Sequence, residues 1–251
     1  MIHLKLTIAY DGTGLVGWQR QPTGTSVQGL LEDALAALEP SGVAVTGAGR
    51  TDAGVHALAQ VASATLRRSI SPDSVVRAVN MRLPPSVRVL RAEETPQGFH
   101  ARFDAVSKTY RYRIANQPVA SPFERLYAWH IPAPQLDEEA MAAAAARVVG
   151  RHDFAAFQGS RSHTTTTVRT VSSSRVEVCR DAAGDRVICY EVCGDGFLRH
   201  MVRSIAGSLV AIGRGRRPPE WIDELLTSGR RSDVGRTAPA CGLFLVGVAY
   251  E

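Results

Sequence analysis

The sequence predicts an α+β fold built from two similar halves, each an α/β sandwich with its strands on one side and its helices on the other. Three observations lead to this expectation. The 251 residues are 45% hydrophobic, which is enough for a substantial core. Apolar residues alternate with polar ones in several short segments, as in half-buried strands, and recur every three to four residues in others, as in amphipathic helices. This succession of strands and helices runs through the first half of the chain and is loosely repeated in the second.

The first half of the chain predicts strands and helices in alternation. We expect, in order, a strand over residues 4–9, a helix over 27–38, strands over 43–46 and 57–66, a helix from 72 and a strand over 87–92. Thr25 or Ser26 supplies the N-cap of the first helix, and Pro40 ends it. Ser71 as N-cap and Pro72 at the first helical position start the second helix.

The second half repeats this order. We expect a strand over 107–115, a helix over 136–149, a hairpin of strands 171–179 and 186–193, a helix over 197–212, a short helix from Pro218 or Pro219 and a strand over 243–250. Gly150 and Gly213 end the two longer helices, and Ala183-Gly184-Asp185 forms the hairpin turn. The chain turns from one sheet into the other near residues 99–107, which gives an N-terminal domain, 1–104, and a C-terminal domain, 105–251.

The charge balance favours a polyanionic partner. Lysine and arginine number 29 against 24 aspartates and glutamates, a formal net charge of +5 at pH 7. Nearly all of the positive charge is arginine, since lysine occurs only at Lys5 and Lys108. A high genomic GC content produces the same arginine bias, so the charge alone does not assign a nucleic-acid ligand.

A cytoplasmic location and reduced cysteines are expected. No apolar run approaches the roughly 20 residues of a membrane helix, and residues 1–7 alternate like a strand, unlike a signal peptide. The four cysteines are Cys179, Cys189, Cys193 and Cys241, and no two of them form a C-x-x-C pair. Neither a zinc site nor a disulfide framework is therefore indicated, and buried free thiols are expected.

The loop 47–56, Gly-Ala-Gly-Arg-Thr-Asp-Ala-Gly-Val-His, lies between two expected strands, where side chains can face a cleft. It resembles G-x-G-x-x-G only superficially, because the third glycine is displaced and the loop leads into a strand rather than a helix. Asp52 follows Arg50 by two residues and precedes His56 by four. A carboxylate beside a fixed cation stays ionised at neutral pH, which suits a nucleophile or a base. A structural Asp52 that pairs with Arg50 explains the spacing equally well.

A second cluster combines aromatic and basic residues on one expected strand. Lys108, Tyr110 and Tyr112 share one face of this strand, and Arg111 and Arg113 share the other. Rings that stack on bases and cations that hold phosphates are typical of single-stranded RNA recognition. This cluster favours a functional carboxylate in the preceding loop over a structural one, although an edge strand with packed tyrosines has the same pattern.

A third cluster lies in the helix expected over 197–212. Arg199 and Arg203 are predicted one turn apart on one face, which ordinarily makes a solvated stripe. Because the rest of this helix is strongly apolar, an arginine near its middle is expected to be partly buried and then to need a carboxylate partner. The Thr-rich tract 162–167 is interpreted as a polar loop.

Together these segments are similar to the tRNA pseudouridine synthase A family. The segments that carry the similarity, in chain order, are Tyr10-Asp11-Gly12, Gly17-Trp18-Gln19-Arg20-Gln21, Ser26-Val27-Gln28, Gly49-Arg50-Thr51-Asp52-Ala53-Gly54-Val55-His56, 99–103, 110–112, 197–203 and 238–246. The resemblance implies two α+β domains that form a long, mostly antiparallel sheet with helices on one side and a central basic cleft. It also implies a homodimer, no cofactor and no metal, and conversion of uridine to pseudouridine in the tRNA anticodon stem-loop, at positions 38, 39 and 40.

The resemblance also assigns roles to residues. Asp52 corresponds to the essential aspartate, Tyr110 to the tyrosine that packs on the target base, and Arg203 to the arginine that pairs with the aspartate. Further contacts to the substrate are expected from Arg50, Lys108, Arg199, Arg20 and Gln28. The chain departs from the family pattern in 161–169 and in the Arg-rich stretch 229–237, both away from the motifs.

Two alternatives from other classes are weighed against this hypothesis. A non-catalytic RNA-binding module would need only the aromatic and basic strand, so the intact Asp52 loop argues against it. A hydrolase that uses Asp52 with His56 would need a second carboxylate or a nucleophile. No serine or cysteine with a base lies at a plausible spacing.

Overall fold

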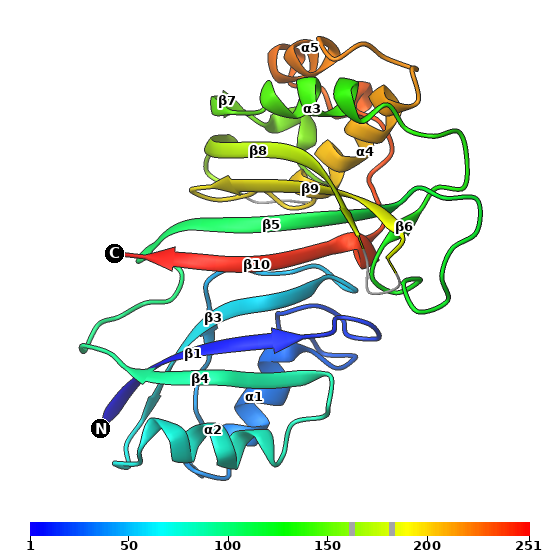
Figure 1. Ribbon diagram of the computed structural model, residues 1–251. Helices are drawn as coiled ribbons and strands as arrows, with labels where there is room; N and C mark the ends of the chain where they lie inside the picture. Colours follow the sequence, from blue (N-terminus) through cyan, green and yellow to red (C-terminus); the bar gives the residue numbers. More distant parts are fainter. Residues whose placement is uncertain (161–163, 181–183) are drawn as a thin grey trace. The chain divides into compact units, whose positions relative to one another are not determined.

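The computed structural model describes residues 1–160, 164–180 and 184–251 (Figure 1). The chain divides into two compact units. Unit 1 comprises Met1–Val106 and Phe244–Glu251, and unit 2 comprises Ser107–Leu243. The expected division after residue 104 had placed the last strand with the second half. The structure places it in unit 1, because its residues Phe244 and Leu245 pair with His56 and Ala57.

Unit 1 contains an antiparallel sheet with one parallel addition. Its strands are β1 (Ile2–Tyr10), β2 (Thr46–Gly47), β3 (His56–Leu66), β4 (Val87–Glu94) and most of β10 (Leu243–Tyr250). Their order is β4-β1-β3-β10, with β2 paired to β3. β1 is antiparallel to β3 and β4, whereas β10 is parallel to β3. Successive side chains of β1 alternate between buried and half-buried positions, which confirms the expected strand.

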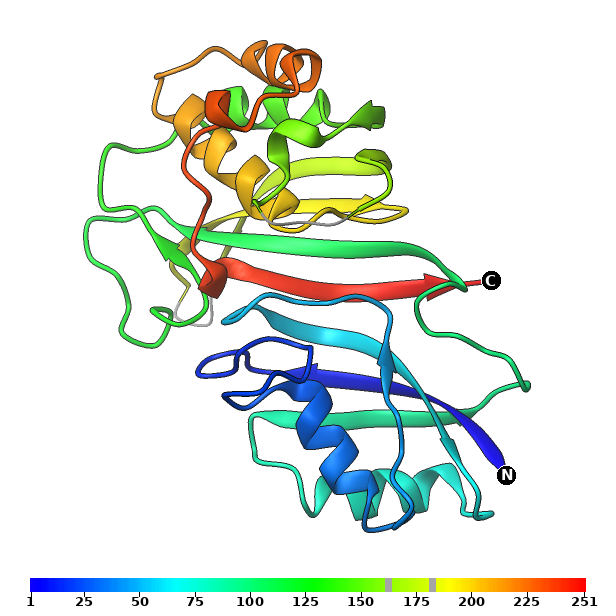
Figure 2. The same ribbon diagram turned by 180° about the vertical axis from the view of Figure 1, so that it is seen from behind.

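Two helices cover one face of the unit 1 sheet, α1 (Val27–Leu35) and α2 (Pro72–Asn80) (Figure 2). Both expected N-caps are present: Ser26 Oγ accepts from Gly29 N at 3.2 Å, and Ser71 Oγ accepts from Ser74 N at 3.4 Å. α1 ends three residues earlier than expected. Its last turn tightens there, because the amides of Leu38 and Glu39 both donate to the carbonyl of Leu35.

Unit 2 contains mostly antiparallel strands. Its strands are β5 (Ala105–Ala115), which starts in unit 1, β6 (Trp129–His130), β7 (Gly150–Asp153), β8 (Val168–Arg180) and β9 (Arg186–Gly194). Their order is β5-β9-β8-β7, with β6 parallel to β5. Its helices are α3 (Glu138–Ala146), α4 (Met201–Gly213) and α5 (Trp221–Ser228), with the short turns η1 (Ala155–Phe157), η2 (Arg231–Asp233) and η3 (Ala240–Gly242). α3 and α4 lie on one face of this sheet (Figure 2). The expected α+β class with a mostly antiparallel arrangement is thus confirmed.

Two helices of unit 2 begin later than the sequence predicts. Asp137 caps α3 by accepting from Ala140 N at 2.9 Å, so that helix starts at 138 rather than 136. α4 starts at Met201 rather than 197, because His200 adopts a left-handed conformation with φ of 62°. The expectation that Arg199 and Arg203 share one face of a helix is therefore wrong, since Arg199 precedes α4.

The cysteines match the expectation only in part. All four are free thiols, as expected, but only Cys189 is buried, and Cys179, Cys193 and Cys241 are half-buried. Burial raises the pKa of Cys189 to about 12, which makes this thiol unreactive at neutral pH. The expected Thr-rich loop and hairpin turn fall in part on residues 161–163 and 181–183, which lie outside the described residues.

Candidate functional site

Asp52 lies in the loop of unit 1 between β2 and β3, as the sequence predicts. The start of the loop is fixed by a hydrogen bond from Ala48 N to the carbonyl of Val61 at 2.7 Å. The loop then turns tightly, with Val55 N donating to the carbonyl of Asp52 at 3.1 Å. Asp52 is half-buried and Arg50 is exposed, so a substrate can reach both side chains.

A buried cluster of polar side chains supports this loop. Gln60, which is fully buried on β3, donates to the carbonyl of Gly49 at 2.9 Å and to the hydroxyl of Tyr10 at 3.4 Å. The Tyr10 hydroxyl in turn lies 2.8 Å from Thr51 Oγ1. Burial raises the pKa of Tyr10 to about 12, so the phenol keeps its proton. Because Thr51 adjoins Asp52, this cluster fixes the backbone beside the carboxylate.

The segment that follows β1 contacts the same loop through its backbone. Trp18 N donates to the carbonyl of Thr51 at 3.1 Å. Gly17 has φ of 102°, and a Cβ at that position would lie 2.6 Å from the Thr51 carbonyl oxygen. Only glycine permits this approach, which explains a glycine here.

His56 is turned into the interior of unit 1. It is 1% exposed and stacks on Phe244 with ring centroids 4.6 Å apart. Its Nδ1 lies 3.0 Å from Gly12 N and 3.1 Å from a carboxylate oxygen of Asp11. These contacts assign His56 to the packing between β3, β10 and the segment after β1, and they argue against its use as the base of a hydrolase.

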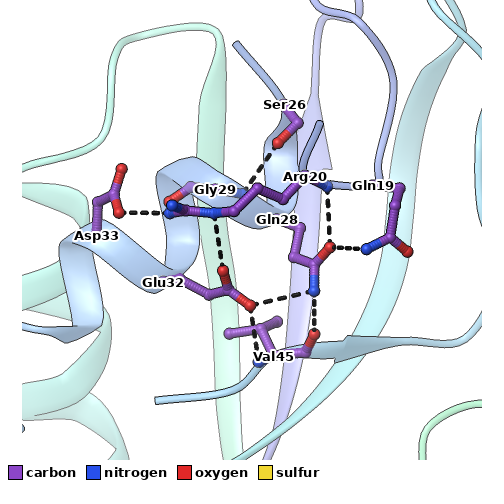
Figure 3. A network of polar contacts seen from close by, with 8 residues as sticks. All are labelled: Gln19, Arg20, Ser26, Gln28, Gly29, Glu32, Asp33 and Val45. Carbon is purple, nitrogen blue, oxygen red and sulfur yellow. Dashed lines mark hydrogen bonds and ion pairs between the residues drawn. The ribbon is translucent and has the colours of Figure 1, made fainter. Parts of the chain in front are cut away.

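Arg20 and Gln28 belong to a network of side chains around the start of α1 (Figure 3). Arg20 Nε lies 3.0 Å from Glu32 Oε2, and its Nη2 donates to Asp33 Oδ1 at 2.5 Å and to the carbonyl of Gly29 at 3.1 Å. Gln28 accepts from Gln19 and from the backbone of Arg20, and donates to Glu32 and to the carbonyl of Val45. Both residues were expected to contact the substrate. In the structure, these side-chain groups form hydrogen bonds and ion pairs within the protein.

Tyr110 and Lys108 lie on β5, in unit 2. Tyr110 is opposite Val192 of β9, and only 7% of it is exposed. Its ring makes an edge contact with Phe197 at a centroid distance of 5.2 Å and an interplanar angle of 80°. Lys108, two residues earlier, is opposite Gly194 and half-buried. The expected sharing of one strand face by the two residues follows from this register.

The two arginines on the other face of β5 have carboxylate partners. Arg111 donates from Nε and Nη2 to Glu191 Oε2, at 3.0 Å and 2.7 Å. The Glu191 carboxylate raises the pKa of the Arg111 guanidinium chiefly through this hydrogen bond. Arg113 lies 2.7 Å from Glu124. Glu191 also lies 2.7 Å from Arg175, so this one carboxylate is shared by two arginines, whereas Arg113 is paired with Glu124.

Arg203 is held on α4 by the segment that precedes β10. Its Nε donates to the carbonyl of Ala238 at 2.8 Å, and Ala238 N donates back to the carbonyl of Arg203 at 3.0 Å. Tyr112, fully buried on β5, donates to the carbonyl of Pro239 at 2.8 Å. Tyr112 thus holds the segment whose Ala238 carbonyl accepts from the half-buried Arg203 side chain, and this contact gives the guanidinium a fixed direction.

Arg199 is exposed in the turn before α4. Its Nη1 donates to the carbonyl of Ser160 at 3.2 Å, and its own carbonyl accepts from Gly159 N at 2.7 Å. An exposed guanidinium held at one nitrogen retains donors for a phosphate.

The expected site residues fall in two groups. Unit 1 contains Asp52, Arg50, Arg20 and Gln28, and unit 2 contains Lys108, Tyr110, Arg199 and Arg203. Sequence reasoning missed the residues that support them, above all Trp18, Gln60, Glu32 and Phe197. Trp18 and Phe197 stand inside the motifs that were singled out, whereas a lone Gln60 or Glu32 gives no signal in a single sequence.

The described residues contain neither a membrane-spanning helix nor a cluster of metal ligands. No helix within residues 1–160, 164–180 and 184–251 is long and apolar enough to cross a membrane. Over the same part of the chain, histidine, cysteine, aspartate and glutamate side chains form no group of three or more that could hold a metal ion.

Comparison with known proteins gives a consistent result. A family model described as tRNA pseudouridine synthase matches residues 6–104 and 144–251. A protein named tRNA pseudouridine synthase A from Pelobacter propionicus is 47% identical over 247 residues, covering 98% of this chain and 99% of that protein. Proteins of the same name from Myxococcus xanthus and Solibacter usitatus are each 46% identical, over 251 and 253 residues. Each match covers 100% of this chain, with 93% of the first protein and 100% of the second.

A solved structure titled "Crystal Structure of a Cbf5-Nop10-Gar1 Complex" is a distant match. Its TM-score is 0.32 and its identity 14%, over 82% of this chain and 45% of that one. At this level of similarity we draw no conclusion from it.

Proposed function

Because the chain belongs to the tRNA pseudouridine synthase family, we propose that it converts uridines 38, 39 and 40 in the anticodon stem-loop of tRNA to pseudouridine. The overall reaction is an isomerisation: the N1–C1′ bond of the uridine breaks, the base turns, a C5–C1′ bond forms, C5 loses its proton and N1 gains one. Atoms and electrons balance without an oxidant, a reductant or a nucleotide. The position of the half-buried Asp52, on a loop held from several sides, is the observation that carries the proposal.

Asp52 is the proposed catalytic residue. A carboxylate can attack C1′ of the ribose, attack C6 of the base, or assist elimination at the ribose, and each route requires it to be ionised and fixed in direction. The hydrogen bonds that Thr51, Gly49 and the turn at Val55 make on both sides of Asp52 support such a fixed carboxylate.

Tyr110 and Arg203 are proposed to act with Asp52. The target nucleotide must leave its stack at a cost of a few kcal/mol, and contact with an aromatic ring offsets part of that cost. Tyr110 is proposed to supply this ring, and its packing against Phe197 supports a fixed orientation. Arg203 is proposed to pair with the Asp52 carboxylate and fix its direction, and the bond from its Nε to Ala238 supports a directed guanidinium.

The remaining substrate contacts are proposed from cations at accessible positions. Arg50 and Arg199 are exposed and Lys108 is half-buried, which supports contacts with tRNA phosphates. The resemblance to the family further leads us to propose a homodimer, which the molar mass in solution will test. A cytoplasmic location is proposed because the substrate is tRNA.

The experiment compares the purified parent protein with Asp52→Asn on an unmodified tRNA transcript, in buffer without added cofactor. We expect the parent protein to form pseudouridine in the anticodon arm, and Asp52→Asn to bind the transcript without converting it. No conversion in the anticodon arm by the parent protein would overturn the proposed function. Binding without turnover by the parent protein would favour the RNA-binding module, and turnover by Asp52→Asn would remove Asp52 from the catalytic role.

A further inference from the structure

We propose that Gln28 is a positioning residue for the reaction, whose side-chain amide holds in place the two chain segments that fix the Asp52 loop. The inference rests on the proposed role of Asp52 and goes beyond it, because it assigns the network at the start of α1 to the geometry of that loop (Figure 3).

The Gln28 side chain forms hydrogen bonds through both its oxygen and its nitrogen. Its Oε1 accepts from Gln19 Nε2 at 2.6 Å and from Arg20 N at 3.0 Å. Its Nε2 donates to Glu32 Oε1 at 3.1 Å and to the carbonyl of Val45 at 3.0 Å. Two donors and two acceptor positions are all that a carboxamide has, so the group is saturated within unit 1. Only a carboxamide in this orientation satisfies all four partners.

These bonds connect two segments that both reach the Asp52 loop. Val45 lies directly before β2, and β2 leads into the loop. Gln19 and Arg20 follow Trp18, whose backbone donates to the Thr51 carbonyl next to Asp52 and accepts from Gln28 N at 2.9 Å.

The two segments also touch each other through the Trp18 ring. The buried indole packs against Gly47 so closely that a Cβ on Gly47 would overlap the ring. Trp18 thus contacts the loop at two places: its ring packs against Gly47 at the start of the loop, and its backbone bonds to Thr51, the residue before Asp52. Gln28 holds the backbone on both sides of that contact, at Val45 and at Arg20.

Glu32 explains why position 28 requires an amide. Its carboxylate accepts from Gln28 Nε2 and lies 3.0 Å from Arg20 Nε. It also accepts from Val45 N at 3.4 Å. A carboxylate at position 28 would bring an oxygen against Glu32 and against the Val45 carbonyl, where two hydrogen bonds now exist. Gln28→Glu is therefore a nearly isosteric change that reverses these two contacts.

The test is single-turnover conversion of a tRNA transcript at saturating protein, for Gln28→Glu and for Gln97→Glu as a control. Gln97 is exposed in the turn after β4, so it reports the effect of one added negative charge on RNA binding. We expect Gln28→Glu to lower the rate at saturation by about 10- to 100-fold, because small displacements of reacting groups have costs of this order. The dissociation constant for tRNA should change no more than in Gln97→Glu.

A compensating exchange adds a readout that general destabilisation would not produce. In Gln28→Glu/Glu32→Gln the donor and the acceptor are swapped and the charge is conserved, so part of the lost rate should return. If Gln28→Glu fails to fold by circular dichroism, Gln28→Met replaces it, with the same expected loss at saturation. A rate equal to that of Gln97→Glu, or weaker tRNA binding with an unchanged rate at saturation, overturns the proposal. An inactive parent protein would instead count against the proposed function itself.

Discussion

The Tyr110 side chain is packed inside the protein and is also proposed to contact the substrate. The ring is packed inside unit 2, with 7% of the residue exposed and its edge contact to Phe197 in place, and it is also proposed to meet the target base. A ring held this way loses little conformational entropy when a base stacks on it, which is an advantage for a residue that must stabilise an unstacked nucleotide. The cost is that changes at this position affect stability and reaction together.

Substitution of Tyr110 separates the ring from the hydroxyl. Tyr110→Phe keeps the ring and its contact with Phe197, so we expect most of the single-turnover rate to remain. Tyr110→Leu removes the stacking surface, which is worth about 1 to 3 kcal/mol per base, and should lower the rate far more. Thermal unfolding of both variants measures how much each substitution lowers stability, so that loss of packing can be separated from loss of stacking on the base. Equal losses of rate in the two variants would show that the hydroxyl is the essential group.

For Arg203 the prediction concerns the rate at saturating tRNA. An ammonium lacks the planar fork and the Nε donor that bonds to Ala238, so Arg203→Lys should lose much of its rate and keep its tRNA affinity. If the cation acts on Asp52, Arg203→Met, which removes the charge as well as the fork, should lower the rate at saturation further than Arg203→Lys.

The matched control for this rate is Arg199→Met, in the exposed turn before α4. It removes one positive charge outside the proposed chemistry, so its rate at saturating tRNA should match that of the parent protein. Equal rates at saturation for Arg203→Met and the parent protein would refute the assigned role of Arg203.

Residues with a motif around them were the predictable part of the site. Asp52 lies where the sequence predicts, in a loop between two strands, because glycines and strand alternation are local signals. The partners of Arg20 and Gln28 were not predictable as a network. Glu32 and Val45 adjoin them only after α1 and β2 have folded, and the family resemblance gave these two residues a role toward the substrate without indicating their partners in the protein.

At the scale of elements, local signals placed the starts of α1 and α2 correctly and the start of α4 wrongly. Ser26 and Ser71 cap helices where expected because a cap is a local hydrogen bond. The start of α4 was wrong by four residues because the left-handed His200 interrupts an apolar pattern that continues through it. Its ring packs against Gly159, which is 41 positions away in sequence and leaves no local trace.

Glu39 connects the end of α1 with the end of β3, and this contact should depend on pH. Its carboxylate accepts from Ser41 Oγ at 2.7 Å and from Arg67 N at 3.0 Å. The hydrogen bond from Ser41, followed by that from Arg67, holds the pKa of Glu39 below its ordinary value of 4.5. The contact therefore stabilises the fold fully above that value, and the contribution is lost as pH falls through the lowered pKa.

The measurement is the free energy of unfolding in urea, at about pH 6 and about pH 3, for the parent protein and Glu39→Gln. We expect stability to fall less between the two pH values in Glu39→Gln than in the parent protein. Glu94→Gln, at an exposed position of β4, removes the same charge and is the control for the loss of one negative charge. A pH dependence in Glu39→Gln equal to that of the parent protein would contradict the assignment.

For the molecule as a whole, the net charge of +5 predicts strongly salt-dependent binding of tRNA. Neutralised phosphates release counterions, so the logarithm of the association constant should fall linearly with the logarithm of the salt concentration. Arg199→Ala should reduce the slope by about 1 if Arg199 contacts one phosphate. Arg82→Ala, exposed after α2, is the control for charge alone, and equal slopes in the two variants would argue against a contact at Arg199.

The parallel pairing of β10 with β3 has a consequence for synthesis of the protein. Unit 1 is assembled from two stretches of chain, and Ser107–Leu243 is translated between them. When residue 106 leaves the ribosome, His56 still lacks the Phe244 ring on which it stacks, and β3 lacks a neighbouring strand. Until the whole of unit 2 has been translated, residues 1–106 therefore have an unpaired sheet edge next to the Asp52 loop. The contacts that hold the Asp52 loop to β1 and β3 can therefore form early, whereas the stacking partner of His56, four residues after Asp52, is added only when β10 has been translated.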